Sequence, residues 1–303
     1  MTSNNDIQAQ NLSRRAMLMK TAGGLGAASL LTLSDACYAT TFWQGESGAK
    51  IKGNLKQSAC RWCYPKIQLE DLAKFGSEIG LKGIDLLNDP NEWPVVKKYG
   101  LIPTMTTGAG TIPDACNRKD LHDKLEKEFQ TNIPRAAENG VPNVITFSGN
   151  RKGMSDGEGL ENTVTMLNRV KDLAEKNNVT ICLELLNSKV DHKDYMCDHT
   201  AWGAEVIKRV NSPRVKLLYD IYHMQIMEGD IIRTIRQNFQ YIAHFHTGGV
   251  PGRHEIDDTQ ELNWRTIAQA IADLHFQGYI AHEFLPKRDP LASLREAVTL
   301  CDV

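Results

Sequence analysis

VKLLYD, residues 215–220, is a short apolar run that ends in a carboxylate, and runs of this kind decide the fold. Its valine and leucines favour a strand of a sheet that is buried on both faces. Seven further runs of similar length are expected to be strands: LKQSA (55–59), GIDLL (83–87), IPTMT (102–106), NVITF (143–147), TICLEL (180–185), IAHFHT (242–247) and YIAHEF (279–284).

Between these runs lie segments whose apolar residues recur every three or four positions, as on one face of a helix. Examples are LEDLAKFGSEIG (69–80), KDLHDKLEKEFQTNIPRAAENG (119–140), GLENTVTMLNRVKDLAEKNN (159–178) and NWRTIAQAIADLHFQG (263–278). Strands alternating with helices through eight such units indicate an α/β fold, a (β/α)8 TIM barrel made by a single domain. A doubly wound open sheet is the competing fold, but SACRWCYP (58–65), at the end of the first strand, has no glycine-rich phosphate turn.

The composition is that of a globular protein of ordinary hydrophobicity. The chain has 303 residues, of which 41% are hydrophobic and 24% charged, so it can bury an enzyme-sized core. Its formal net charge is −2, so it lacks the basic surface that would hold a polyphosphate backbone or an anionic membrane. We therefore expect no nucleic-acid partner.

The N-terminus has the pattern of an export signal. NLSRRAMLMK (11–20) places Arg14 and Arg15 before TAGGLGAASLLTL (21–33), a weakly apolar run of small residues. This order is typical of twin-arginine signals, and the run is too short and too rich in glycine for a good membrane span. We expect a signal over 1–39, a linker over 40–54 and the barrel over 55–303. The mature protein is then periplasmic or otherwise exported, without stable membrane insertion.

The cysteines do not form a recognisable framework. Cys60 and Cys63 have the spacing of redox and zinc sites, but no second pair completes a zinc site and no thioredoxin-like pattern surrounds them. We expect these two residues to be structural or to line a pocket. The other cysteines that would remain after signal cleavage are scattered: Cys116, Cys182, Cys197 and Cys301.

Polar residues interrupt or close the last four predicted strands. Glu184 lies in TICLEL, Asp220 ends VKLLYD, His246 lies in IAHFHT and Glu283 lies in YIAHEF. In a (β/α)8 barrel the carboxyl ends of the strands meet at one face, where active sites lie. Three acids and an imidazole at that face predict a divalent-cation site, because a metal neutralises carboxylates that would otherwise repel one another. Taken singly, each acid could instead be salt-bridged or, like Asp220, cap a turn, and His246 could be a core histidine.

His244 shares a strand face with His246, because side chains alternate along a strand. We interpret His244 as part of a lower layer of the barrel interior rather than as a partner of the metal site. The predicted ligands are nitrogen and oxygen atoms without thiolate. That set favours Mn²⁺, Mg²⁺ or Co²⁺ and leaves Zn²⁺ open.

Five motifs together resemble the xylose-isomerase-like barrel superfamily of sugar isomerases and epimerases, and most closely its hydroxypyruvate-isomerase-like members. The motifs are KQSACRWCY (56–64), LELLN (183–187), YDIYHMQ (219–225), HFHTGGVPGRHE (244–255) and HEFLP (282–286). The resemblance implies that Glu184, Asp220, His246 and Glu283 bind one metal, and that Glu184 and Glu283 also move protons. His246 stands where hydroxypyruvate isomerases commonly have glutamine, as in ketose epimerases, so the substrate stays open.

The resemblance also implies residues that bind the substrate. His223 and Arg253 resemble the family's contacts to substrate oxygens. Asn187 matches the asparagine that follows the first glutamate motif and is expected to bind the substrate as well. We expect Gly248 and Gly249 to let the loop turn sharply, so that Arg253 reaches back over the pocket. A salt bridge at the rim with Glu255 or Asp257 is the alternative for Arg253. In the first loop, Trp62 and Tyr64 are expected either to form a wall that stacks against a sugar or to be ordinary packing residues.

These parts imply a metal-dependent isomerase or epimerase of a keto-sugar or a small hydroxy-keto acid, in which glutamates transfer a proton through a metal-bound enediolate. A dehydratase or lyase acting on an oxidised sugar, and a non-catalytic sugar-binding barrel, are the alternatives. Abasic-site endonucleases use a related barrel, but TMTTG (104–108) and TFSGN (146–150) lack the additional histidines and acids that those enzymes need. The expected partner is a small-molecule substrate, and the sequence leaves a homo-oligomer open.

Overall fold

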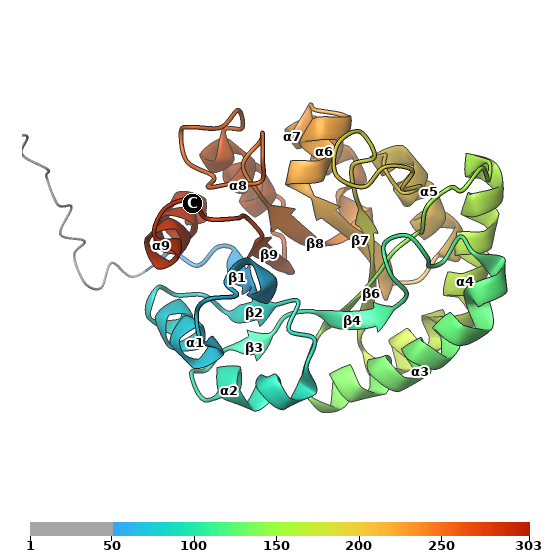
Figure 1. The fold of residues 1–303 in the computed structure, drawn as a ribbon, viewed down its shortest axis with the longest axis horizontal. Coiled ribbons are helices and arrows are strands. Elements are labelled where there is room, and N and C mark those ends of the chain that lie inside the picture. Colours follow the sequence, from blue (N-terminus) through green and yellow to red (C-terminus); the bar gives the residue numbers. More distant parts are fainter. Residues whose placement is uncertain (1–50) are drawn as a thin grey trace, which may run out of the picture. The chain divides into compact units, whose positions relative to one another are not determined.

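The computed structural model describes residues 51–303, so the predicted signal (1–39) and most of the predicted linker (40–54) lie outside the described residues. In the described part, strands and helices alternate around a ring (Figure 1). The strands are β1 (Lys56–Cys60), β2 (Gly83–Asp85), β3 (Ile102–Pro103), β4 (Thr106–Ala109), β5 (Asn143–Thr146), β6 (Thr180–Leu185), β7 (Val215–Asp220), β8 (Ile242–Thr247) and β9 (Tyr279–His282). The α-helices are α1 (Leu69–Glu78), α2 (Trp93–Lys97), α3 (His122–Glu138), α4 (Asp156–Asn177), α5 (Thr200–Val210), α6 (Ile221–Met227), α7 (Ile231–Asn238), α8 (Trp264–Asp273) and α9 (Pro290–Cys301).

The strands form one parallel sheet in the order β3-β2-β1-β9-β8-β7-β6-β5-β4. The two ends of this order, β3 and β4, are consecutive pieces of chain that occupy the place of the single strand predicted over 102–106. Pro103 has no N–H to donate to the sheet, which is a physical reason for the break. The predicted TIM barrel is therefore confirmed, with its third strand in two pieces.

The barrel interior is built in layers, because residues two apart on a strand point to the same side. Met105, Ile145, Cys182 and Leu218 form a small buried apolar cluster. His244 is in register with Leu218, and His246 is in register with Asp220. His244 therefore lies one layer below His246, as expected from the strand period.

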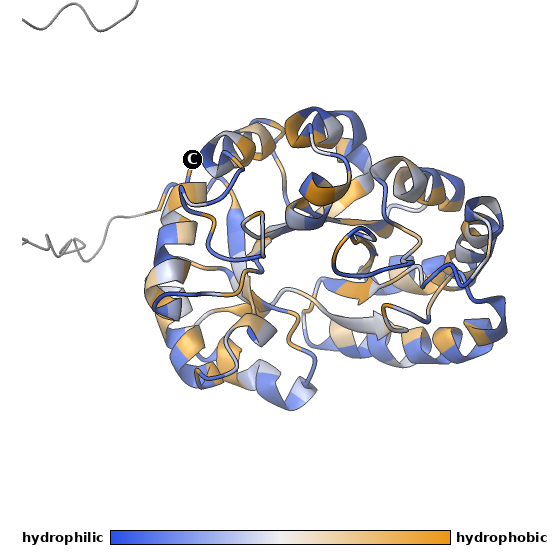
Figure 2. Cartoon of the chain, turned by 45° about the horizontal axis from the view of Figure 1, so that its top comes forward, coloured by the Kyte–Doolittle hydropathy of each residue, from blue (hydrophilic) through white to orange (hydrophobic). Residues whose placement is uncertain are grey.

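The helices cover the sheet through apolar stripes. In α3 the buried residues include Leu125, Phe129, Ile133 and Ala136, whose spacing of four, four and three places them on one face. Figure 2 shows the resulting mixture of apolar and polar residues along the helices of the ring. These stripes hold the strands in place from outside, so the polar strand ends can point inward.

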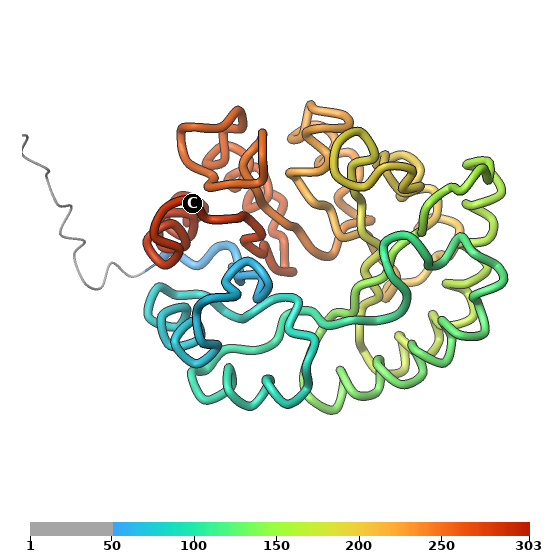
Figure 3. Tube along the Cα trace, viewed as in Figure 1, coloured from blue at the N-terminus to red at the C-terminus, as the bar shows by residue number. Residues whose placement is uncertain are grey.

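The ring closes where the two ends of the described chain meet. β1 pairs with β9, and Asn54 Nδ2 donates to the backbone oxygen of Val303 at 2.7 Å. Figure 3 shows the blue start of the described chain beside its red end. Within residues 51–303, no helix combines the length and the apolar character needed to cross a membrane.

Candidate metal centre

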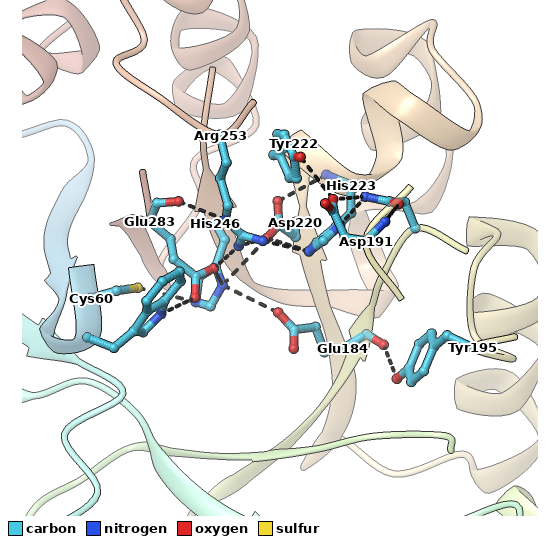
Figure 4. A network of polar contacts seen from close by, with 12 residues as sticks. Cys60, Glu184, Asp191, Tyr195, Asp220, Tyr222, His223, His246, Arg253 and Glu283 are labelled. Carbon is cyan, nitrogen blue, oxygen red and sulfur yellow. Dashed lines mark hydrogen bonds and ion pairs between the residues drawn. The ribbon is translucent and has the colours of Figure 1, made fainter. Parts of the chain in front are cut away.

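Four polar side chains from neighbouring strand ends converge inside the barrel. Glu184 comes from β6, Asp220 from the last position of β7, His246 from β8, and Glu283 directly follows β9. Each offers one candidate ligand atom, and all four atoms lie within 4.8 Å of one another. Figure 4 shows these side chains pointing toward a common point. All four are buried, so their charges cannot be compensated by bulk water.

His246 lies at the centre of this cluster. Its Nδ1 atom is 2.6 Å from Glu283 Oε2, 3.5 Å from Glu184 Oε1 and 3.9 Å from Asp220 Oδ2. Among the described side chains, Nδ1 has no partner in proper hydrogen-bond geometry. A nitrogen lone pair and carboxylate oxygens so close together repel unless a cation or a proton lies between them. The donor set therefore fits a divalent cation.

Burial and neighbouring charges give the two glutamates different pKa values. Burial raises the pKa of Glu184 to about 7. Burial also raises the pKa of Glu283, but the positive charges of Arg253 and His246 outweigh it and hold that pKa at about 2. For His246, burial lowers the pKa, yet the charge of Glu283 raises it well above the usual value. Two carboxyl groups with such different proton affinities can act as an acid and a base at one pH.

Asp220 has two structural tasks. Its side chain caps α6 by accepting the backbone N–H of His223 at 3.2 Å. Its other oxygen, Oδ2, is 2.6 Å from Arg253 Nη2. The capping alternative from the sequence is thus correct, and it does not exclude the cluster, because a carboxylate has two oxygens.

Arg253 reaches over the cluster from the loop after β8. Besides Asp220, its guanidinium contacts the carboxylate of Glu283 and donates from Nε to the Glu283 backbone oxygen at 3.0 Å. It also lies over the Tyr222 ring, with 4.9 Å between Cζ and the ring centroid. The alternative rim salt bridge is wrong, because Glu255 and Asp257 pair with Arg288 instead.

The loop that carries Arg253 turns at other residues than expected. The left-handed backbone is at Gly252 (φ 89°) and at Arg253 itself (φ 57°), whereas Gly248 and Gly249 are not left-handed. Gly249 is needed for a different reason: a Cβ atom there would lie 2.2 Å from the Glu255 backbone oxygen. The predicted role of Gly248 and Gly249 in the turn is thus corrected to close packing of the loop on itself.

His223 and Asn187 join the site from its outer side. His223 Nε2 is 2.7 Å from Arg253 Nη1, and its Nδ1 is 2.6 Å from Asn187 Nδ2. Burial and the charge of Arg253 lower the pKa of His223 well below its usual value, so this ring is neutral. Asn187 also accepts the backbone N–H of Asp191, at 2.9 Å. These contacts form a chain of polar groups from the loop after β6 to Arg253 (Figure 4).

The residues of the first loop divide into a surface and a core group. Trp62 is 44% exposed, and its indole N–H donates to Glu283 Oε1 at 2.6 Å. Tyr64 is 1% exposed, so it cannot form a wall against a sugar and is a packing residue. Cys60 and Cys63 are buried free thiols, and burial raises the pKa of each well above its usual value. Cys63 packs in the hydrophobic core, whereas Cys60, at the end of β1, also places its Sγ 4.0 Å from His246 Nε2.

One buried acid next to the cluster, Asp85, was not among the residues predicted from the sequence. Asp85, the last residue of β2, is fully buried and contacts His246 Nε2 at 3.0 Å. Burial alone would raise the pKa of Asp85, but the adjacent His244 and His246 lower it well below its usual value. The signal was visible: Asp85 interrupts GIDLL in the same way that Glu184 interrupts TICLEL. Its strand, GIDLL, lies far along the chain from the last four predicted strands, which carry the other polar residues of the cluster.

Comparisons with known proteins agree with this fold. Residues 94–301 match the family described as xylose isomerase-like TIM barrel. A Danio rerio protein provisionally named hydroxypyruvate isomerase is 32% identical over 61% of this chain and 55% of its own length. The 2-oxo-tetronate isomerase of Cupriavidus necator is 31% identical over 40% of this chain and 46% of its own length. The D-psicose 3-epimerase of Ruminiclostridium cellulolyticum is 33% identical over 41% of this chain and 40% of its own length. The chain thus spans about half the length of the curated relatives it matches.

Solved structures show the same fold at low sequence identity. An AP endonuclease, family 2, from Brucella melitensis superimposes with a TM-score of 0.71 at 20% identity, over 79% of this chain and 97% of that one. A 3-keto-D-glucoside 4-epimerase from E. coli gives a TM-score of 0.68 at 18% identity, over 82% of this chain and 98% of that one. At such identities the likeness concerns the barrel architecture.

Proposed function

Because the chain belongs to the xylose isomerase-like TIM barrel family, we propose that it is a divalent-metal-dependent isomerase or epimerase of a keto-sugar or a small hydroxy-keto acid. The names of the relatives, among them a 2-oxo-tetronate isomerase and a D-psicose 3-epimerase, support this class of reaction. The observation that carries the proposal is the buried cluster of Glu184, Asp220, His246 and Glu283.

The arginine pair in residues 1–39 supports a periplasmic or exported location for this activity.

The cluster would hold the cation through three carboxylates and His246 Nδ1. This set of oxygen and nitrogen donors suits Mn²⁺, Mg²⁺ or Co²⁺, with Zn²⁺ as a further candidate. A cation bound there acts as a Lewis acid toward a carbonyl and a neighbouring hydroxyl of the substrate. The protein supplies a buried site, so charges that develop in the reaction interact strongly with the residues around them.

Glu184 and Glu283 are the proton-transfer pair. Without a bound cation their pKa values are about 7 and about 2, so Glu184 holds a proton more strongly than Glu283 does. One carboxylate removes the carbon-bound proton, and the other returns a proton to the neighbouring carbon or to the opposite face of the same carbon. The first outcome is isomerisation and the second epimerisation.

Arg253, His223 and Trp62 orient the substrate. Arg253 is held in place by Asp220 and Glu283, so its guanidinium is already oriented to hold a substrate oxygen. His223, neutral and adjacent to Arg253, offers a second polar contact. Trp62 is exposed and donates to Glu283 Oε1, so its ring gives a sugar an apolar face to pack on beside the cluster.

The experiment that tests the proposal follows deuterium uptake from heavy water. Purified protein is loaded with one divalent metal at a time and incubated with a panel of keto-sugars and hydroxypyruvate. We expect incorporation of deuterium at the carbon next to the carbonyl, detected by mass spectrometry, and loss of incorporation when a chelator removes the metal. Metal binding without uptake on any substrate would contradict the isomerase and favour a dehydratase, a lyase or a sugar-binding protein.

The affinity for the metal is expected to depend on pH through Glu184. The carboxyl group of Glu184 must lose its proton to become a ligand, and its raised pKa of about 7 means that it holds this proton in mildly acidic solution. His246, whose pKa is raised as well, must lose its proton on both sides of pH 7. Below about pH 7, where Glu184 must also lose a proton, the affinity should therefore fall about tenfold more per pH unit than it does above pH 7. Calorimetric titration on both sides of pH 7 measures this effect. If the metal affinity of the Glu184→Gln variant fell just as steeply below pH 7, a group other than Glu184 would be responsible for this pH dependence.

A further inference from the structure

Asp85 is a fully buried carboxylate that the proposed reaction does not use. It contacts four side chains: His246 through Nε2 at 3.0 Å, His244 through Nε2 at 3.3 Å, Cys60 through Sγ at 3.7 Å, and Thr104, whose hydroxyl donates to Oδ1. β2, which carries Asp85, is three places from β8 in the sheet order, so the contact with His246 crosses the barrel interior. A buried charge held in this way calls for an explanation.

The contact with Asp85 determines which nitrogen of His246 carries the proton. A protonated His246 has no lone pair, so the ring must give up one proton to bind a metal. The neutral imidazole that results has one N–H group and one lone pair, and an ionised carboxylate can only accept a hydrogen bond. At 3.0 Å from Asp85 Oδ2, Nε2 must therefore be the protonated nitrogen. The lone pair is then on Nδ1, which faces Glu184, Asp220 and Glu283.

We propose that Asp85 is a positioning residue that holds His246 in the tautomer and orientation in which Nδ1 serves as the metal ligand. This inference rests on the proposed metal site. Histidine ligands of metals generally donate their second N–H to a carboxylate or a carbonyl group, which orients the ring and makes the ligand nitrogen more basic. Here the orienting carboxylate comes from a distant strand, and Thr104 holds its other oxygen.

A second metal ion between Asp85, His244 and His246 is the competing explanation, because these three side chains also form a compact set. That arrangement would need the lone pair of His246 Nε2. The same nitrogen cannot donate a proton to Asp85 and bind a metal, so the number of bound metal ions and the state of Nε2 separate the two explanations.

The test compares Asp85→Asn with Asp198→Asn in the full chain. Asp198 is a buried aspartate that pairs with Arg151 at 3.1 Å and lies 2.8 Å from His199, but it contacts none of the four cluster residues. The control therefore makes the same chemical change in a buried, histidine-contacting aspartate. Zn²⁺ affinity and stoichiometry are measured by competition with a chelating dye. The protonation of each ring nitrogen of His246 is measured by ¹⁵N NMR on Zn²⁺-loaded protein with labelled histidine.

We expect one Zn²⁺ per wild-type chain, with Nε2 of His246 protonated. Asp85→Asn should bind Zn²⁺ about 10–100-fold more weakly, whereas Asp198→Asn should bind as the wild type does. Equal affinities in the two variants, or a metal-bound Nε2 in the wild type, would overturn the inference. Two Zn²⁺ per wild-type chain, with one lost in Asp85→Asn, would overturn it in favour of the second metal.

One result separates the inference from the proposed function, and a second variant covers the case in which Asp85→Asn does not fold. Failure of the wild type to bind Zn²⁺ would refute the metal site itself, and with it the role of Asp85. If Asp85→Asn does not fold, Thr104→Val removes only the hydroxyl that holds Asp85. A smaller loss of affinity in that variant, together with the protonated Nε2 in the wild type, would support the inference, and unchanged affinity would oppose it.

Discussion

Replacing Glu184 or Glu283 with glutamine is expected to stop deuterium uptake into the substrate, with a loss of about 10²–10⁴-fold in rate for each variant. Glutamine has nearly the shape of glutamate and can still offer an oxygen to a cation, but it cannot accept or return a proton. Both side chains are buried beside His246, so water cannot easily replace the missing carboxylate. The rate is measured by mass spectrometry in heavy water on the substrate identified from the panel.

The two variants should differ in a second respect. Glu283 also accepts the indole N–H of Trp62 and pairs with Arg253, whereas Glu184 contacts neither. Glu283→Gln is therefore expected to raise KM as well as to lower kcat, and Glu184→Gln to act mainly on kcat. Metal content must be measured in both, because a variant that lost its metal would report on ligation rather than on proton transfer.

A suitable control for these variants is Glu228→Gln. Glu228 follows α6 and accepts hydrogen bonds from the backbone and the hydroxyl of Thr200, outside the cluster. Its replacement should leave the exchange rate close to that of the wild type. Retained exchange in Glu184→Gln or in Glu283→Gln would remove that residue from the proton-transfer pair.

Replacing Arg253 with alanine is expected to lower the free energy of unfolding of the metal-free protein. It is also expected to weaken the binding of substrate. The Arg253 side chain is 13% exposed and pairs with two buried carboxylates, Asp220 and Glu283. Removing one partner of a buried ion pair costs about 3–5 kcal/mol, because the other charge stays buried without compensation. For a domain of this size, the melting temperature should fall by on the order of 10 °C.

Added metal should restore much of this stability in Arg253→Ala, since a cation in the cluster neutralises the same carboxylates. The rise in KM should remain, because the metal does not replace the guanidinium toward the substrate. Thermal unfolding with and without metal, together with steady-state kinetics, separates the two effects. A melting temperature that does not respond to metal, or an unchanged KM, would contradict the corresponding part of this prediction.

Arg288→Ala provides the matched control for Arg253. Arg288 also pairs with several carboxylates, those of Glu255, Asp257 and Glu296, but its side chain is 48% exposed. Exposed ion pairs contribute about 0–1 kcal/mol, because water screens the charges. The contrast between the two arginines thus tests whether burial, rather than the number of partners, determines the effect.

Local sequence patterns were sufficient to predict most of the strands of the barrel. β6, β7 and β8 coincide with the predicted runs 180–185, 215–220 and 242–247, because buried parallel strands have a composition that can be recognised within six residues. Strand ends were less predictable. β2 stops at Asp85 and β9 at His282, since a strand ends where its neighbours stop pairing with it.

The candidate site was predictable where each residue interrupts its own strand. Glu184, Asp220, His246 and Glu283 stand out in apolar runs, and the strand period places such residues inside the barrel. The environment of Arg253 was not predictable in this way. Its pairing with Asp220, 33 residues away, rather than with the nearby Glu255 or Asp257, depends on how the loop folds back over the strand ends.

By itself, the sequence determined the order of strands and helices and which strand ends carry acids and imidazole, because both follow from side-chain patterns over a few residues. Only the tertiary structure decided which of these groups touch. Asp85 and His246 are 161 residues apart and meet because the barrel closes between β1 and β9. Closure depends on the register of the whole sheet, and no segment of a few residues contains that information.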